Sequence, residues 1–182
     1  ALRLGQRVVV HPGIACGRCE FCRRGEDVLC SSMKLLGEHR DGTFAELVSV
    51  PARNVFPAPE GWDDGEAAAL GVNHLTAWRM LFTQAQLRPN ETVLVFGIGG
   101  GVSLAALQLA KAAGARVIVT SRDAAKLEHA RTLGADGTVH SSTQDIAKTV
   151  VNLTGGRGVD VVIENVGAAV WGSALKSLVR GG

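Results

Sequence analysis

The sequence contains no tyrosine, and its aromatic residues amount to only 4% of the chain. The hydrophobic fraction of 46% therefore rests largely on valine, leucine and alanine, which suits a globular core of aliphatic side chains. No stretch approaches the ~18 consecutive apolar residues of a membrane-spanning helix. The net charge is only +2, with both signs interspersed, so neither a nucleic-acid nor a membrane partner is predicted.

Cysteine is scarce as well, and the four cysteines form one array, Cys16, Cys19, Cys22 and Cys30. Four thiolates leave no position for water and are typical of a closed, structural zinc site. Disulfides are an alternative, but they need an oxidising compartment, we expect no signal peptide here, and cysteines this close are awkward to bridge. An iron–sulfur cluster is another, but the ferredoxin motif has a shorter last gap and a proline after the final cysteine. We predict structural Zn2+.

The first third of the sequence has a β-rich pattern. Residues 8–10 are a short apolar run, and residues 44–50 alternate loosely, so each is predicted to form a strand. Pro57 and Pro59 bracket a linker. We place the domain boundary here, with residues 1–60 in one domain and residues 61–182 in the other.

A helix is predicted from Glu66 to about Phe82, with Asp63 or Asp64 as its N-cap. Short apolar strands then alternate with amphipathic helices, which is typical of a parallel sheet with right-handed helical crossovers. The fold class is therefore predicted to be α/β, a doubly wound parallel (Rossmann) sheet. The strands are expected at 92–96, 116–120, 138–140 and 159–164, and the helices at 102–113, 124–133, 144–153 and 169–178.

A glycine-rich turn follows the first of these strands. Glycines let the backbone approach a pyrophosphate, and the free N–H groups at a helix start point towards it. A tight turn without a ligand is the alternative, but the position between a strand and a helix favours a dinucleotide site. At the third small position stands a serine, so the packing there must accept a hydroxyl. The predicted cofactor-binding residues of this turn are Gly97, Gly99, Gly100, Gly101, Val102 and Ser103.

The end of the second strand bears on the choice of cofactor. NAD enzymes place an acidic residue there for the ribose 2′-hydroxyl, whereas this sequence has Ser121, Arg122 and, one helical turn on, Lys126. These side chains suit a 2′-phosphate, and Asp123 is expected to cap the following helix. A solvated basic surface is the alternative. We predict NADP(H), with NAD(H) possible.

These features together resemble the medium-chain dehydrogenase/reductase superfamily, the zinc alcohol dehydrogenases and their quinone oxidoreductase relatives. The resemblance implies a β-rich GroES-like catalytic domain with a zinc lobe before the Rossmann sheet. It implies an oxidoreductase with a small-molecule substrate, cytoplasmic, homo-oligomeric when full length, of which this chain is an internal part. The matching segments include 5–10, the cysteine array, 41–46, 75–78, 93–97, 108–111, 133–136 and 158–162.

The resemblance also assigns roles to single residues. A catalytic-zinc cysteine of the alcohol dehydrogenases corresponds here to Val72, which cannot bind a metal, so a catalytic zinc is not expected. Thr76 matches the residue that lies against the nicotinamide. Asn73 and His74 are one turn earlier and are candidate hydrogen-bond donors to a substrate oxygen; ordinary helix polarity is the alternative.

A further turn, after the strand at 159–164, is implied to lie near the cofactor through Asn165 and Gly167. The predicted activity is NADP(H)-dependent hydride transfer to or from a small carbonyl, a quinone or an activated alkene. Two alternatives remain open: a zinc-dependent alcohol dehydrogenase, and a non-catalytic nucleotide-binding relative.

Overall fold

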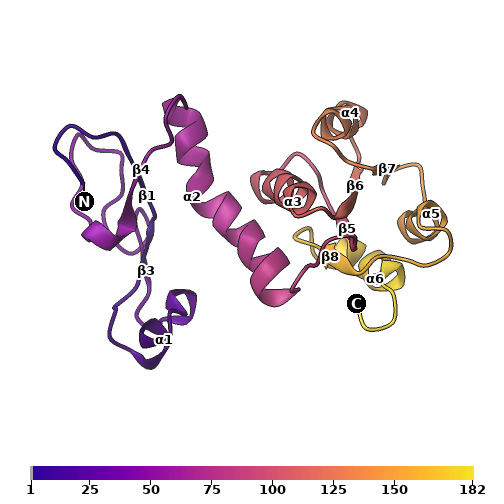
Figure 1. Ribbon diagram of the computed structural model, residues 1–182, viewed down its shortest axis with the longest axis horizontal. Coiled ribbons are helices and arrows are strands. Elements are labelled where there is room, and N and C mark those ends of the chain that lie inside the picture. The colour runs from indigo at the N-terminus through magenta and orange to yellow at the C-terminus, as the bar shows by residue number, and fades with distance from the viewer. Residues whose placement is uncertain (1) are drawn as a thin grey trace. The chain divides into compact units, whose positions relative to one another are not determined.

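The computed structural model describes residues 2–182 (Figure 1). The chain divides into two compact units, Ala1–Val72 and Asn73–Gly182. The predicted boundary, between residues 60 and 61, lies before the long helix α2 (Asp64–Trp78), whereas the two units meet within this helix. The boundary of the functional domains stays a prediction. Among residues 2–182, no helix is long and apolar enough to cross a membrane.

The first unit consists of two small antiparallel pairs and short helices. Asn54 links its segments, because its buried side-chain amide donates hydrogen bonds to the carbonyls of His11 (2.9 Å) and Gly13 (2.7 Å). The predicted strand at 8–10 is confirmed. The elements are β1 (Val8–Val10) paired with β4 (Val55–Pro57), β2 (Gly13–Ile14) paired with β3 (Lys34–Leu35), helix α1 (Glu20–Arg23), and 3-10 turns at Asp27–Leu29 and Ala52–Asn54.

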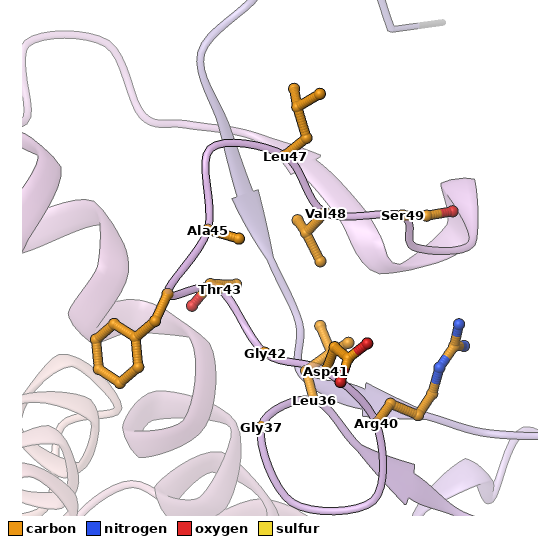
Figure 2. A pocket seen from close by; sticks show the side chains of 11 residues that line it. Leu36, Gly37, Arg40, Asp41, Gly42, Thr43, Ala45, Leu47, Val48 and Ser49 are labelled. Carbon is orange, nitrogen blue, oxygen red and sulfur yellow. The ribbon is translucent and has the colours of Figure 1, made fainter.

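The strand predicted at 44–50 is wrong for this structure. Among residues 2–182, no backbone group pairs with residues 41–50, and a strand without a neighbour has no ladder to stabilise it. Phe44 and Leu47 are 111% and 91% exposed, so the alternating pattern has no surface to bury against. Instead, residues 36–49 form an open loop around a hollow of about 1060 Å³ (Figure 2).

Helix α2 begins with a reciprocal cap. The Glu66 N–H donates to the Asp63 carboxylate (2.8 Å), and the Asp63 N–H donates to the Glu66 carboxylate (3.0 Å). Asp63 is therefore the cap, as one of the two predicted choices. The helix ends at Trp78 and continues as a π-helical segment, Arg79–Gln84, rather than running regularly to Phe82.

The second unit contains a four-stranded parallel sheet of order β7-β6-β5-β8 (Figure 1). All four predicted strands and all four predicted helices form, and the doubly wound α/β fold is confirmed. The strands are β5 (Thr92–Val95), β6 (Arg116–Ser121), β7 (Gly137–His140) and β8 (Val161–Ile163), and the helices are α3 (Gly101–Ala112), α4 (Ala124–Thr132), α5 (Ile146–Leu153) and α6 (Ala168–Ser177).

The helices cover both faces of this sheet. Val93 and Val95 of β5 pack in one core cluster with residues of α3 and α4. Leu94, which points to the opposite face, packs in a second cluster with residues of α5 and α6. Burial on both faces explains why the strands read as continuous apolar runs. The carboxyl ends of β5 and β8 lie side by side where the strand order reverses, and this switch point is where such sheets bind ligands.

Candidate metal centre and candidate cofactor site

The four cysteines come together in the first unit, and all four are free thiols. Their sulfur atoms lie within 4.8 Å of one another. Cys19 precedes α1 and Cys22 lies in it, while Cys30 follows the turn Asp27–Leu29. The guanidinium of Arg53 donates to the carbonyl of Ala15, next to Cys16.

The geometry of the cluster fits a tetrahedral metal. Zinc–sulfur bonds of ~2.3 Å place the sulfurs of a tetrahedron about 3.8 Å apart. The Cys16 and Cys22 sulfurs are 3.9 Å apart, and those of Cys19 and Cys22 are 3.4 Å apart. The N–H groups of Cys16 and Cys19 point at the sulfurs of Cys30 and Cys16, as thiolates favour.

The surroundings of these thiols shift their pKa values in opposite directions. Hydrogen bonds from the backbone N–H groups of Arg18 and Cys19 lower the pKa of Cys16 to about 6. Burial, together with the neighbouring Cys19, raises the pKa of Cys22 to about 12. One thiolate is thus favoured while the next is opposed, and a central metal ion removes this opposition because it deprotonates the thiols it binds.

In the second unit, the glycine turn starts directly after β5. Gly97 and Gly99 have φ angles of 62° and 111°, values that favour glycine. The Gly97 N–H donates to the Thr120 hydroxyl (3.2 Å), and the Ile98 N–H donates to the Thr120 carbonyl (2.8 Å). The turn is therefore anchored on β6, the neighbouring strand.

The backbone N–H groups of residues 99–103 form an anion-binding cradle. Among residues 2–182, none of these five groups finds a hydrogen-bond acceptor, and the first regular helical bond of α3 runs from the Leu104 N–H to the Gly100 carbonyl (2.9 Å). A helix N-terminus with successive free N–H groups favours phosphate oxygens. The cradle fits a pyrophosphate.

The structure shows how the hydroxyl of Ser103, at the third small position of the turn, is accommodated. Its side chain is 1% exposed, and its hydroxyl lies 2.9 Å from the Gly97 carbonyl and 3.0 Å from the Gly100 carbonyl. The hydroxyl is satisfied within the turn itself, so the packing accepts it at no cost of an unpaired polar group.

Two of the glycines are needed because of their neighbours. A Cβ atom on Gly99 would lie 2.6 Å from Cδ of Lys126, and a Cβ atom on Gly101 would overlap the side-chain amide of Asn73. The structure therefore brings Lys126 and Asn73 to the turn, from α4 and α2 respectively. Any larger residue at either glycine would displace one of these side chains.

Of the three residues predicted near the end of β6, Ser121 is its last residue, Arg122 follows it, and Lys126 lies in the first turn of α4. Ser121 is buried, and its hydroxyl oxygen accepts a hydrogen bond from the Asp123 N–H (3.1 Å). Asp123 caps α4 as predicted, because its Oδ1 accepts from the Ala125 N–H (2.8 Å). Arg122 and Lys126 are exposed. The Ser121 hydroxyl has no acceptor for its own proton among residues 2–182, and of the three side chains only the two cations are open to solvent.

The turn after β8 lies beside the glycine turn. A Cβ atom on Gly97 would meet Cγ2 of Val166 at 3.2 Å, so Val166 lies against Gly97. Gly167 has a φ of 97° and donates its N–H to the Glu164 carboxylate (2.8 Å), which fixes this turn. Asn165 is exposed. Gly167 and Asn165 thus lie at the switch point, in the turn after β8. Val166 and Thr120, which also contact the glycine turn, were not identified from the sequence.

The three predicted catalytic residues have different environments. Asn73 lies against the glycine turn rather than alone on its helix. The Nδ1 atom of His74 is buried and has no hydrogen-bond partner within residues 2–182. Thr76 is exposed. Val72, at the position of the expected metal-binding cysteine, is 54% exposed. The roles of these residues stay predictions.

The fold and the cradle together define a doubly wound α/β protein of the dinucleotide-binding type. Two family models match the chain: the alcohol dehydrogenase GroES-like domain over residues 1–60, and zinc-binding dehydrogenase over residues 101–182. The chain therefore belongs to the zinc-binding alcohol dehydrogenases of the medium-chain dehydrogenase/reductase superfamily. The predicted resemblance is confirmed.

Similar proteins support this assignment. The sorbitol dehydrogenase of Bacillus subtilis (strain 168) is 35% identical over 183 residues, which cover 99% of this chain and 51% of that protein. The crystal structure of an NAD-dependent alcohol dehydrogenase matches with a TM-score of 0.95 and 47% identity, over 98% of this chain and 52% of that one.

A third similar protein is from Sinorhizobium meliloti 1021, described as a zinc-binding dehydrogenase and crystallised with NADP. It matches with a TM-score of 0.86 and 34% identity, over 100% of this chain and 53% of that one. The chain spans about half the length of the curated relatives it matches.

Proposed function

We propose that the protein containing this chain is an NADP(H)-dependent oxidoreductase that transfers hydride to or from a small carbonyl, a quinone or an activated alkene. The observation that carries the proposal is the cradle of five free N–H groups at residues 99–103, with two exposed cations shortly after β6 in the sequence, Arg122 and the α4 residue Lys126. The amides suit the pyrophosphate and the cations suit a further phosphate.

The hydrogen bonds at the end of β6 favour NADP(H) over NAD(H). The Ser121 oxygen already accepts a bond from the Asp123 N–H, so the hydroxyl is left to donate, which suits a phosphate oxygen. The nearest carboxylate, Asp123, is turned to the start of α4. One similar structure carries NADP and another is of an NAD-dependent enzyme, so relatives of this fold use either cofactor.

Hydride transfer is the chemistry that the bound nicotinamide supplies. We propose that Thr76 lies against the nicotinamide and that Asn73 and His74 donate hydrogen bonds to the substrate oxygen. The buried, unpartnered Nδ1 of His74 and the position of Asn73 at the glycine turn support these roles. Asn165 and Gly167 complete the cofactor site from the turn after β8.

We further propose that Cys16, Cys19, Cys22 and Cys30 hold one structural zinc. The distances between their sulfur atoms and the four-thiolate donor set fit this metal. A zinc-dependent alcohol dehydrogenase is the second candidate function, because the relatives include a sorbitol dehydrogenase and an NAD-dependent alcohol dehydrogenase. Val72 is the observation against a catalytic zinc.

Cofactor choice is tested by replacing both Arg122 and Lys126 with alanine in the full-length protein. We expect the wild type to bind NADPH more tightly than NADH, and the double variant to lose most of this preference, since each charge-assisted hydrogen bond contributes about 1.5–3 kcal/mol. Dissociation constants from nicotinamide fluorescence provide the measurement.

The matched control replaces two exposed lysines of other helices, Lys148 and Lys176, and should leave the preference unchanged. Equal affinities for NADPH and NADH in the wild type would contradict the proposal. The two cations would then be ordinary surface charges.

The reaction is tested with NADPH and a panel containing a quinone, an enone and an aldehyde. We expect turnover that survives a chelator able to remove only exposed metal. Activity that disappears with the metal and returns with added zinc would instead establish the zinc-dependent alcohol dehydrogenase.

A further inference from the structure

Ser103 occupies an unusual position for a serine in a dinucleotide-binding turn. It lies in the first turn of α3, its side chain is 1% exposed, and its hydroxyl is within hydrogen-bond distance of two carbonyl oxygens. These belong to Gly97 (2.9 Å) and Gly100 (3.0 Å), the two ends of the loop that the glycines form. One side chain thus spans the whole loop.

The two carbonyls depend on this hydroxyl to different degrees. The Gly100 oxygen also accepts the Leu104 N–H (2.9 Å), whereas the Gly97 oxygen has no other donor among residues 2–182. The single hydroxyl proton therefore matters most to Gly97. Removing the hydroxyl would take away the one donor among residues 2–182 that holds this carbonyl in place, and the peptide that carries it would be freer to rotate.

This peptide, between Gly97 and Ile98, is held from both ends. Its carbonyl is bound by Ser103 of α3, and its N–H donates to the Thr120 carbonyl of β6 (2.8 Å). With these bonds in place, the carbonyls at both ends of the loop are directed at Ser103, and the N–H groups of residues 99–103 stay free. Rotation of the peptide would bring a carbonyl oxygen towards the anion that these groups attract.

We propose that Ser103 is a positioning residue for cofactor binding: its hydroxyl fixes the Gly97 and Gly100 carbonyls so that the five free N–H groups form a preorganised pyrophosphate site. The inference rests on the proposed dinucleotide function and adds to it. Ser103 acts through the backbone and does not itself touch the cofactor. Its contribution is specific to the pyrophosphate and does not extend to the phosphate-binding end of β6.

The experiment compares two variants of the full-length protein, Ser103→Ala and Ser103→Cys, with a matched control, Ser177→Ala. Ser177 is likewise a fully buried serine whose hydroxyl donates to a carbonyl, that of Ser173 (2.8 Å), but it belongs to α6. Cysteine keeps the site filled, with a somewhat larger atom, while replacing the strong donor of serine with a weak one. Dissociation constants are measured for NADPH and for adenosine 2′-monophosphate, which lacks a pyrophosphate, alongside the melting temperature.

Both Ser103 variants are expected to bind NADPH about tenfold more weakly, the change that ~1.4 kcal/mol produces, with affinity for adenosine 2′-monophosphate within twofold of the wild type. The control should bind both ligands normally, whatever its melting temperature. If Ser103→Ala fails to fold, Ser103→Cys decides the question because it leaves no cavity.

Wild-type affinity for NADPH in the Ser103 variants would overturn the inference and leave the proposed function intact. Equal weakening for both ligands would also overturn it, because that pattern indicates a general loss of structure. A wild-type protein that binds neither NADPH nor NADH would instead overturn the proposed function, and this inference with it.

Discussion

Gly101 illustrates how a single residue is constrained by its neighbour rather than by its own backbone. It is the first residue of α3, and a Cβ atom there would overlap the side-chain amide of Asn73. We expect Gly101→Ala to weaken NADPH binding about tenfold, because it pushes Asn73 away from the turn. Combined with Asn73→Ala, the same substitution should cost far less, and this coupling is measured by a double-mutant cycle of NADPH dissociation constants.

The control for this cycle is Gly172→Ala in α6, where a Cβ atom would meet nothing within 4 Å. That substitution should raise the free energy of unfolding by about 0.5–1 kcal/mol, as alanine does in place of glycine within a helix. If Gly101→Ala weakens NADPH binding equally with and without the Asn73 side chain, the proposed clash with Asn73 is contradicted. The weakening would then come from the backbone of the turn itself.

Residues whose role is local were predictable from the sequence. The glycines of the turn and the cap Asp123 follow from short-range patterns, and both lie where the sequence places them. Thr120 and Val166 were missed because their roles depend on the register between strands and on the contact between two turns far apart in sequence. The signal that was available for Thr120 is a polar residue near the end of an otherwise apolar strand.

The strands of the parallel sheet were predictable as elements because burial on both faces gives each of them a short apolar run. The failed strand at 44–50 shows the limit of that reasoning. Alternation predicts a strand only where a partner strand and a core exist, and neither is available to these residues among 2–182. The π-helical segment Arg79–Gln84 was likewise not predicted from the hydrophobic pattern of the sequence.

Each central strand begins at a carboxylate that accepts a backbone N–H of the strand. Asp160 accepts from the Thr92 N–H of β5 (2.8 Å) and binds both terminal nitrogens of Arg157 (2.6 and 2.9 Å). Asp136 does the same for β6, accepting from the Val117 N–H (2.6 Å) and the Lys111 ammonium (2.8 Å). The two carboxylates therefore join the strand starts to the surrounding loops and to α3.

This arrangement predicts an acid-sensitive sheet. The hydrogen bonds from Arg157 hold the pKa of Asp160 below its usual range. A carboxyl group with a lowered folded-state pKa stabilises the fold above its unfolded pKa of ~3.9, and this stability is lost as the pH falls through the folded-state pKa. We expect Asp160→Asn to lower the free energy of unfolding at pH 7 by about 1–3 kcal/mol, with a smaller difference below pH ~4.

Urea unfolding curves at several pH values measure this difference. Glu128→Gln is the control, because Glu128 is paired with Arg131 at an exposed position where ion pairs contribute little. A loss of stability for Asp160→Asn that is the same at pH 3 and pH 7 would show that the carboxylate charge is not the cause.

At the scale of the whole molecule, the metal cluster and the cofactor site belong to different compact units. Cys16 and Cys30 lie in Ala1–Val72, whereas both core clusters of the sheet are built from residues 77–178. The binding free energy of a structural metal is folding free energy for the segment that holds it. The proposed zinc should therefore stabilise the first unit without forming part of the core of the second.

We expect the full-length protein to contain one zinc per chain, and the double variant Cys16→Ser/Cys30→Ser to contain none. The variant should show a lower melting temperature for the first unit while binding NADPH within twofold of the wild type, because the cradle at residues 99–103 draws on none of the cysteines. Elemental analysis, thermal unfolding and NADPH titration give the three measurements, with Ser31→Ala as the control beside the cluster. Two zincs per wild-type chain would establish a catalytic metal despite Val72, and one zinc retained by the double variant would show that the cysteines are not its ligands.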